Sequence, residues 1–141
     1  MSYNYSESFG FALSQAAGVM KNRVHMALRG VEVTPEQTAV ILRLSENRGV
    51  SPTVLAEAIA KDKPTTVRIL AKLNQKGLIS MQESLKDKRS YSVCLTEKGS
   101  ALQASLIPIV EAVKAQALKD FEPVEIAEFN RLLKKTHRNL V

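Results

Sequence analysis

The chain has 141 residues and a formal net charge of +6, with 45% hydrophobic and 24% charged residues. This length fits one compact domain, or a small module with extra helices attached, and the composition is typical of a folded soluble protein. The single cysteine, Cys94, excludes an internal disulfide and a multi-cysteine metal site. The sequence has no long apolar run and no signal-peptide pattern, so we expect a cytoplasmic protein without a membrane partner.

The chain begins with a long predicted helix from about Ser6 to Arg29, in which apolar residues recur at helical spacing. Gly30 is a suitable stop for it. The next helix has a clear start, because Thr34 can act as N-cap, Pro35 fits the first helical position and Gln37 completes a capping box.

Two further helices follow. Ser51 and Pro52 repeat the same start pattern before a short helix. Asp62 is then the predicted N-cap of a helix from Lys63 to Lys76, which ends at Gly77, a good left-handed cap position.

After Gly77 the hydrophobic period changes from helical to alternating. Leu78–Glu83 and Tyr91–Leu95 are predicted strands joined by a charged turn. Thr96 caps a long helix that contains Pro108, where we expect a kink or a local break. A last helix follows Pro123. The predicted fold class is therefore mainly α with a small β-hairpin (α+β), and two short helices followed by a hairpin are typical of a winged helix-turn-helix.

The helix Lys63–Lys76 has a face that is suited to the major groove of DNA. Spacing predicts that Thr66, Ile69, Leu70 and Leu73 are buried. Arg68 can then contact a guanine in bidentate fashion, and the methyl groups of Val67 can meet a thymine methyl. The candidate DNA-binding residues of this helix are Pro64, Thr65, Val67, Arg68 and Lys72. An amphipathic helix whose outer face is only solvated remains the alternative.

The hairpin turn adds positive charge beside this helix. Between Lys61 and Arg89 the chain carries eight basic residues against three acidic ones. The turn itself contributes Lys86, Lys88 and Arg89, which we predict to lie along the DNA backbone and in the minor groove. Asp87 is a poor DNA contact, and we expect it to support the turn or orient Arg89.

The first and the last two helices carry apolar stripes for which a chain of this size has too little partner surface. Pairing two copies across a two-fold axis would bury these stripes. We therefore predict a homodimer with three parts: an N-terminal dimerisation helix in residues 1–33, a DNA-binding winged helix-turn-helix in residues 34–99 and C-terminal dimerisation helices in residues 100–141.

The run from Asp87 to Gly99 resembles the signature of the multiple antibiotic resistance regulator (MarR) family: Asp-x-Arg, five residues, then Leu-Thr-x-x-Gly. The upstream residues Leu55-Ala56-Glu57, Asp62-Lys63, Arg68, Leu73 and Lys76-Gly77-Leu78-Ile79 are also similar to that family. The resemblance implies an intertwined dimer that grips a pseudo-palindromic operator in double-stranded DNA. It also implies that Arg89 is the wing arginine and that Lys63–Lys76 is the recognition helix. The sequence departs from the family pattern at Pro64 and Val67, which implies a different operator sequence.

The same resemblance implies a small aromatic or phenolic effector, bound in a cleft between the dimerisation helices and the winged module. Met20, Val24, Ile41 and Leu106 are candidate walls of that cleft, and each is equally consistent with plain core packing. A ligand there would favour a spacing of the two recognition helices that does not fit the groove.

The sequence bears on three classes of function. The favoured one is a sequence-specific transcriptional regulator, in such families most often a repressor. The alternative is a winged-helix protein-interaction module without specific DNA binding, which would predict a wing without basic residues. An enzyme is not expected, because the sequence has no triad spacing, phosphate loop or paired carboxylates, and we expect no cofactor and no metal. His25 and His137 lack metal-ligand neighbours, and Cys94 fits inert packing better than a redox role.

Overall fold

A computed structural model of the chain describes residues 2, 4–83 and 90–141. In chain order it contains a 3-10 turn (Tyr5–Glu7), α1 (Phe9–Ala27), α2 (Pro35–Ile41), α3 (Pro52–Ala58), α4 (Lys63–Gln75), β1 (Ile79–Glu83), β2 (Tyr91–Leu95), α5 (Glu97–Ala117) and α6 (Pro123–Leu140). The predicted order of helices and hairpin is confirmed, and so is the mainly α fold class.

Side-chain caps account for most of the helix starts. Thr34 and Gln37 form the predicted capping box of α2, and the side chains of Ser51, Asp62 and Thr96 accept from the third residue of α3, α4 and α5. Each cap satisfies a backbone N–H that has no partner inside the helix. The first helix starts later than predicted, because the cap is Ser8 and a 3-10 turn precedes it.

Of the kink or local break expected at Pro108, the break is wrong, because α5 runs through this residue from Glu97 to Ala117. Proline removes one N–H and frees the carbonyl four residues earlier, at Ala104. Both Pro108 and Ala104 are exposed, so water can hydrogen-bond the freed carbonyl.

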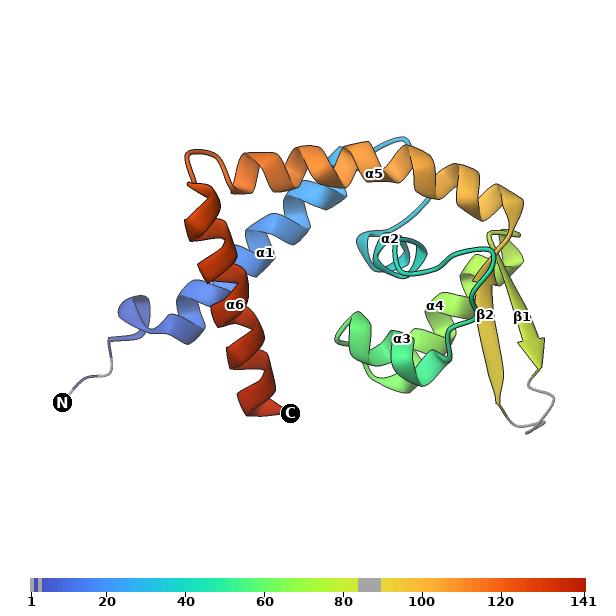
Figure 1. Cartoon of the computed structure of the whole chain (residues 1–141), viewed down its shortest axis with the longest axis horizontal. Coiled ribbons are helices and arrows are strands. Elements are labelled where there is room, and N and C mark those ends of the chain that lie inside the picture. Colours follow the sequence, from blue (N-terminus) through green and yellow to red (C-terminus); the bar gives the residue numbers. More distant parts are fainter. Residues whose placement is uncertain (1, 3, 84–89) are drawn as a thin grey trace.

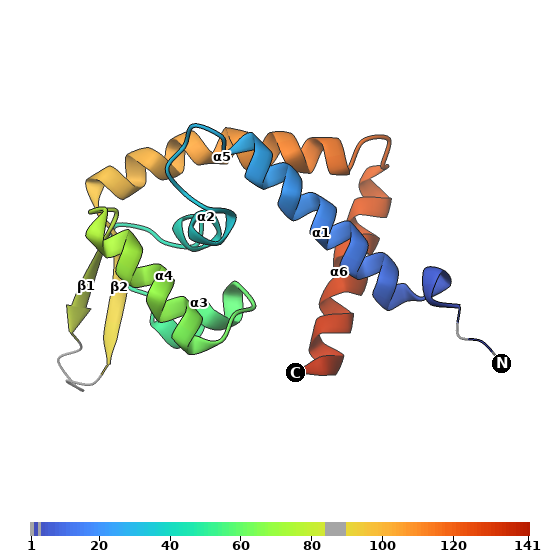
Figure 2. The same ribbon diagram turned by 180° about the vertical axis from the view of Figure 1, so that it is seen from behind.

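The helix α5 spans the molecule and connects its two halves (Figures 1 and 2). The helices α2, α3 and α4 and the hairpin lie below its N-terminal half, whereas α1 packs against α5 and α6 turns back from its C-terminal end. The two strands are antiparallel, with Ile79 opposite Leu95 and Glu83 opposite Tyr91.

The main hydrophobic cluster lies in and around the winged half. It draws fully buried side chains from every helix of that half, from β2 and from α5: Val40, Ile41, Leu55, Leu70, Leu73, Val93 and Leu106. Val50, in the connection before α3, pairs with Val93 and so holds this connection against the hairpin. In contrast, neither α1 nor α6 contains a buried residue.

Candidate nucleic-acid interface

The helix α4 has the orientation that the sequence predicts. Thr66, Leu70 and Leu73 are buried, and Ile69 packs against the same core. On the opposite side Pro64, Arg68 and Lys72 are exposed, and Val67 is 38% exposed. A polar and cationic face of α4 is therefore free to meet a ligand.

A short hydrogen-bond network organises the N-terminal end of α4. The Thr65 amide donates to Asp62 Oδ1 at 2.7 Å and the Thr65 hydroxyl to Asp62 Oδ2 at 2.9 Å. The same hydroxyl accepts from Arg68 Nη2 at 3.2 Å. These hydrogen bonds from Thr65 hold the pKa of the Asp62 carboxyl below its usual range. Thr65 thus links the helix cap to the guanidinium of Arg68 and places that group near the helix start.

The turn between α3 and α4 contains a residue that the sequence did not single out. Ala60 has a φ of 56°, in the left-handed region that alanine rarely adopts. The next amide, that of Lys61, donates to Ala56 O at 3.0 Å and closes α3. This turn sets the angle between the two helices, and alanine gives no signal in the sequence for it.

The Leu-Thr-x-x-Gly segment joins the hairpin to the end of α4. The Thr96 hydroxyl donates to Gly77 O at 2.6 Å, and the Thr96 amide donates to Leu78 O at 3.1 Å. A Cβ atom at Gly99 would lie 2.0 Å from Leu78 O, so no other residue fits there without moving the backbone. Leu95 is buried in the core. The motif therefore fixes the hairpin relative to α4.

The tip of the hairpin, with Lys86, Asp87, Lys88 and Arg89, lies outside the described residues. The described strands are paired from Ile79 and Leu95 to Glu83 and Tyr91.

Two side chains tie the helix-turn-helix to the long helices, and the sequence analysis missed both. The Gln103 amide donates to Ile41 O at 2.8 Å and to Leu44 O at 2.9 Å, so α5 satisfies two carbonyls at the end of α2. The Lys21 ammonium forms an ion pair with Glu36 at 2.6 Å, which joins α1 to α2. Its hydrogen bond lowers the pKa of Glu36. Only three-dimensional neighbours could reveal these contacts.

The four candidate effector residues lie in different surroundings. Ile41 and Leu106 are fully buried in the core, and Val24 packs against it. Met20 is exposed and lines a hollow between α1 and α5. The structure therefore does not bring the four side chains to one common surface.

Two other groups of residues bear on redox and metal chemistry. Cys94 is buried in β2. Across the described ranges, no three His, Cys, Asp or Glu side chains gather as they would around a metal ion. In the same ranges no helix is both long enough and apolar enough to cross a membrane.

An exposed cationic helix that is packed on a helix-turn-helix and followed by a hairpin defines the winged helix-turn-helix class of DNA-binding proteins. A model of the MarR family matches residues 33–91, which include α2, α3, α4 and β1 and end where β2 begins. This part of the chain is therefore similar to the MarR family of transcriptional regulators.

Solved structures share the fold of this chain over nearly its whole length. A MarR-family regulator from Listeria monocytogenes, solved with a 26-mer DNA, is 25% identical with a TM-score of 0.87, over 95% of this chain and 89% of that one. BpsR from Bordetella bronchiseptica, studied for regulation of its DNA binding by 6-hydroxynicotinic acid, is 24% identical (TM-score 0.85; 97% and 98% covered). CouR from Rhodococcus jostii, bound to p-coumaroyl-CoA, is 20% identical (TM-score 0.83; 96% and 95% covered).

Proposed function

We propose that this chain is a transcriptional repressor that binds a pseudo-palindromic operator as a homodimer. The observation that carries the proposal is the outer face of α4, where Arg68 is exposed and held by Thr65 while the opposite face is buried. Arginine in this position can donate two hydrogen bonds to guanine O6 and N7 in the major groove. The Listeria relative, whose structure contains DNA, has the same fold.

The DNA contacts fall into two sets. Pro64, Thr65, Val67, Arg68 and Lys72 of α4 face the bases and the nearest phosphates. Lys86, Lys88 and Arg89 at the hairpin tip, with Asp87 as their support, follow the backbone into the minor groove. The contacts from α4 determine the sequence preference, and the contacts from the hairpin tip add affinity that depends on salt.

The homodimer accounts for the apolar faces that α1 and α6 leave uncovered. Phe9, Val124 and Leu140 are each more than 70% exposed, and further exposed apolar residues lie on the same two helices. Burying them against a second copy removes apolar surface from water. In this arrangement residues 1–33 and 100–141 dimerise, residues 34–99 bind DNA, and the half-sites lie roughly 34–36 Å apart.

A small aromatic or phenolic acid acts as the effector and releases the operator. Two relatives of the same fold are linked to aromatic ligands, 6-hydroxynicotinic acid and p-coumaroyl-CoA. Of the four residues predicted to line the effector cleft, Met20 is the one at an accessible hollow, about 480 Å³ in volume and lined by α1 and α5.

The decisive experiment is selection of bound sequences from random double-stranded DNA, followed by fluorescence anisotropy on the enriched site. We expect an inverted repeat and a steep loss of affinity with salt. Arg68→Ala should weaken binding about 5- to 150-fold and relax preference at one base position, the equivalent of about 1–3 kcal/mol. Arg89→Ala should weaken binding to all sequences and reduce the salt dependence.

The matched control is Lys119→Ala, which removes one exposed positive charge between α5 and α6, far from α4 (Figure 1). Its affinity should equal that of the parent protein. If no sequence is enriched, or if Arg68→Ala and Arg89→Ala bind as the control does, the chain is a protein-interaction module instead. Transcription in vitro from a promoter that contains the site distinguishes repression from activation.

A further inference from the structure

The charged head of Arg68 is joined to the start of α4 by a chain of hydrogen bonds that passes through Thr65. Arg68 Nη2 donates to the Thr65 hydroxyl at 3.2 Å, and this hydroxyl donates to Asp62 Oδ2 at 2.9 Å. Chemistry fixes the direction of both bonds, because a guanidinium can only donate and an ionised carboxylate can only accept. The single proton of the Thr65 hydroxyl is therefore used within the protein.

The Asp62 end of this chain is anchored in the hydrophobic core. The backbone carbonyl of Asp62 accepts from the Thr66 amide at 3.1 Å and from the Thr66 hydroxyl at 2.9 Å. Thr66 itself is completely buried. The Asp62 carboxylate also accepts from the Thr65 amide at 2.7 Å, so both of its oxygens have a partner in the helix. Asp62 and Thr65 thus form a fixed base for Arg68, which is exposed.

Charges along α4 act on the Arg68 guanidinium in the same sense. Asp62 attracts it from the N-terminal side, and Lys72, one helical turn later, repels it from the C-terminal side. In the described part of the chain Arg68 forms no ion pair that would draw it elsewhere. Thr65 takes one N–H donor of the guanidinium and leaves the others free. Arg68 therefore holds its free donors in a preferred direction before DNA is bound.

We propose that Asp62 and Thr65 are positioning residues that make Arg68 selective for guanine, and that the donors of Thr65 do not themselves contact DNA. An unrestrained arginine can leave the base for a neighbouring phosphate, and phosphates carry no sequence information. An arginine that is held in place loses less freedom when it makes two hydrogen bonds to the edge of one guanine. The network therefore raises discrimination between bases. This inference rests on the proposed function and deepens it, because it changes the role of Thr65 from contact to support.

The test compares two duplexes by fluorescence anisotropy. One is the operator enriched from random DNA, and the other has adenine in place of the guanine at which Arg68→Ala relaxes the preference. Thr65→Val keeps the shape of the side chain and the amide that caps the helix, but it removes the hydroxyl. It should lower the preference for guanine about 3- to 10-fold. Thr65→Ser keeps the hydroxyl and should restore the preference.

A double variant separates support from contact. If Thr65 acts through Arg68, adding Thr65→Val to Arg68→Ala changes the preference for guanine no further, whereas a direct contact from Thr65 gives additive losses. The matched control is Ser105→Ala on α5. It removes an exposed hydroxyl that also donates within its own helix, to Leu102 O, and it should bind both duplexes as the parent does.

The network itself can be measured without DNA, from the pKa of the Asp62 carboxyl in an NMR titration. Thr65→Val should raise this pKa because the carboxylate loses one donor, and Thr65→Ser should leave it low. The proposal is overturned if Thr65→Val leaves the pKa or the preference for guanine as in the parent, or if its loss adds to that of Arg68→Ala. If no sequence is enriched from random DNA, the proposed function fails and this proposal fails with it. Enrichment by the parent, with the same preference in Thr65→Val, overturns this proposal alone.

Discussion

The winged half of the molecule and the arms formed by α1 and α6 use similar sequence patterns with opposite results. Both contain helices with apolar residues at helical spacing. In the winged half the stripes meet each other, and Leu55, Leu70 and Leu73 are completely buried. In the arms no residue is buried, and Val124 and Leu140 are 74% and 80% exposed. An apolar stripe therefore shows that a face requires a partner, but not whether that partner belongs to the same chain.

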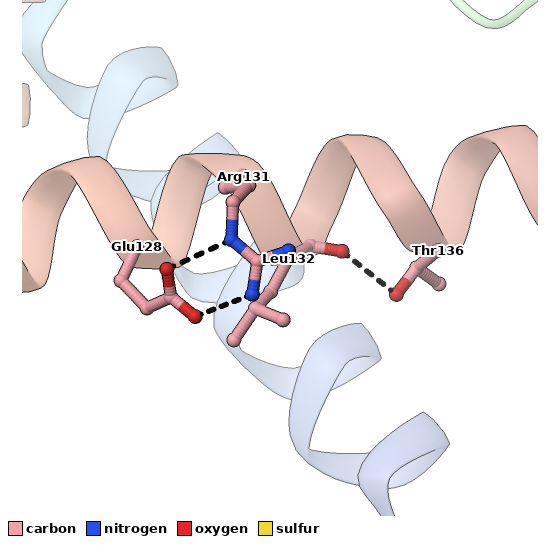
Figure 3. A network of polar contacts seen from close by, with 4 residues as sticks. All are labelled: Glu128, Arg131, Leu132 and Thr136. Atoms are coloured by element: carbon pink, nitrogen blue, oxygen red, sulfur yellow. Dashed lines mark hydrogen bonds and ion pairs between the residues drawn. The ribbon is translucent and has the colours of Figure 1, made fainter.

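On the polar face of α6, charged and polar side chains find partners within the helix itself. Arg131 donates to both carboxylate oxygens of Glu128, at 2.8 and 2.5 Å, and Thr136 donates to Leu132 O (Figure 3). These contacts are all between residues three or four positions apart, which stabilise a helix locally. The apolar face of α6, in contrast, has no buried residue.

The largest expected difference between the two regions is in the stability lost when a leucine side chain is truncated to alanine. Leu70→Ala should lower the free energy of unfolding by about 2–5 kcal/mol, because it leaves a cavity in a closed core. The matched variant Leu132→Ala, at a side chain that is 45% exposed, should cost less than about 1 kcal/mol at protein concentrations where the chain is monomeric. Urea denaturation measures both. Equal losses in the two variants would mean that the arms are as closed as the core.

The second prediction concerns association. Phe129→Asp places a charge on the apolar face of α6 and should weaken dimerisation by about 100-fold or more. The control is Val54→Asp on α3, which places the same charge at an exposed apolar residue of the winged half. Light scattering should give the mass of two chains for the parent and the control, and of one chain for Phe129→Asp. A parent protein with the mass of one chain would contradict the homodimer.

Local signals explain which parts of the fold the sequence could predict. Thr34, Asp62 and Thr96 each cap a helix through a backbone amide three residues later, so the evidence for the cap lies within a few positions. The buried face of α4 follows from spacing in the same way. The break expected at Pro108 did not occur, since a proline on an exposed helix side costs only one hydrogen bond within the helix.

The remaining features depend on residues that are distant in the sequence. Gln103 bonds to carbonyls about sixty positions earlier, and Lys76 to Glu32 and Gln37. No local pattern marks either residue. The residues of the effector cleft were hard to predict for a different reason. Isoleucine and leucine occur both in hydrophobic cores and in apolar pockets. In this structure Ile41 and Leu106 belong to the core.

A smaller effect is expected at the turn between α3 and α4. Ala60→Gly should raise the stability of the winged half by about 1 kcal/mol, because glycine adopts a positive φ without the steric cost that alanine has there. Ala115→Gly, at an exposed position in the last turn of α5, should instead lower stability by up to about 1 kcal/mol. Thermal unfolding of both variants compares them directly, and a loss in Ala60→Gly would show that the turn is not strained.

The smallest effect concerns pH. The pKa of Asp62 is lowered in the folded chain by hydrogen bonds from Thr65, so its contribution to stability is complete above the pKa of the unfolded chain. It is lost as the pH falls through the folded pKa, below about pH 4. Asp62→Asn keeps a side-chain oxygen for the cap but does not titrate. At neutral pH the parent should therefore melt at a higher temperature than Asp62→Asn, and in acid this difference should vanish or reverse. A difference in melting temperature that stays the same at all pH values would contradict this.

The junction formed by Thr96 and Gly99 also bears on the order of folding. The hydrogen bond between Thr96 and Gly77 joins residues 19 positions apart, and the hairpin between them pairs over still shorter separations. The contact between α1 and α5, by comparison, closes a loop that includes the whole winged module. Short loops lose less chain entropy on closure and form sooner. We therefore expect α4 and the hairpin to become structured on the ribosome or during refolding before the arms do, so that each new chain acquires its proposed DNA-binding surface first.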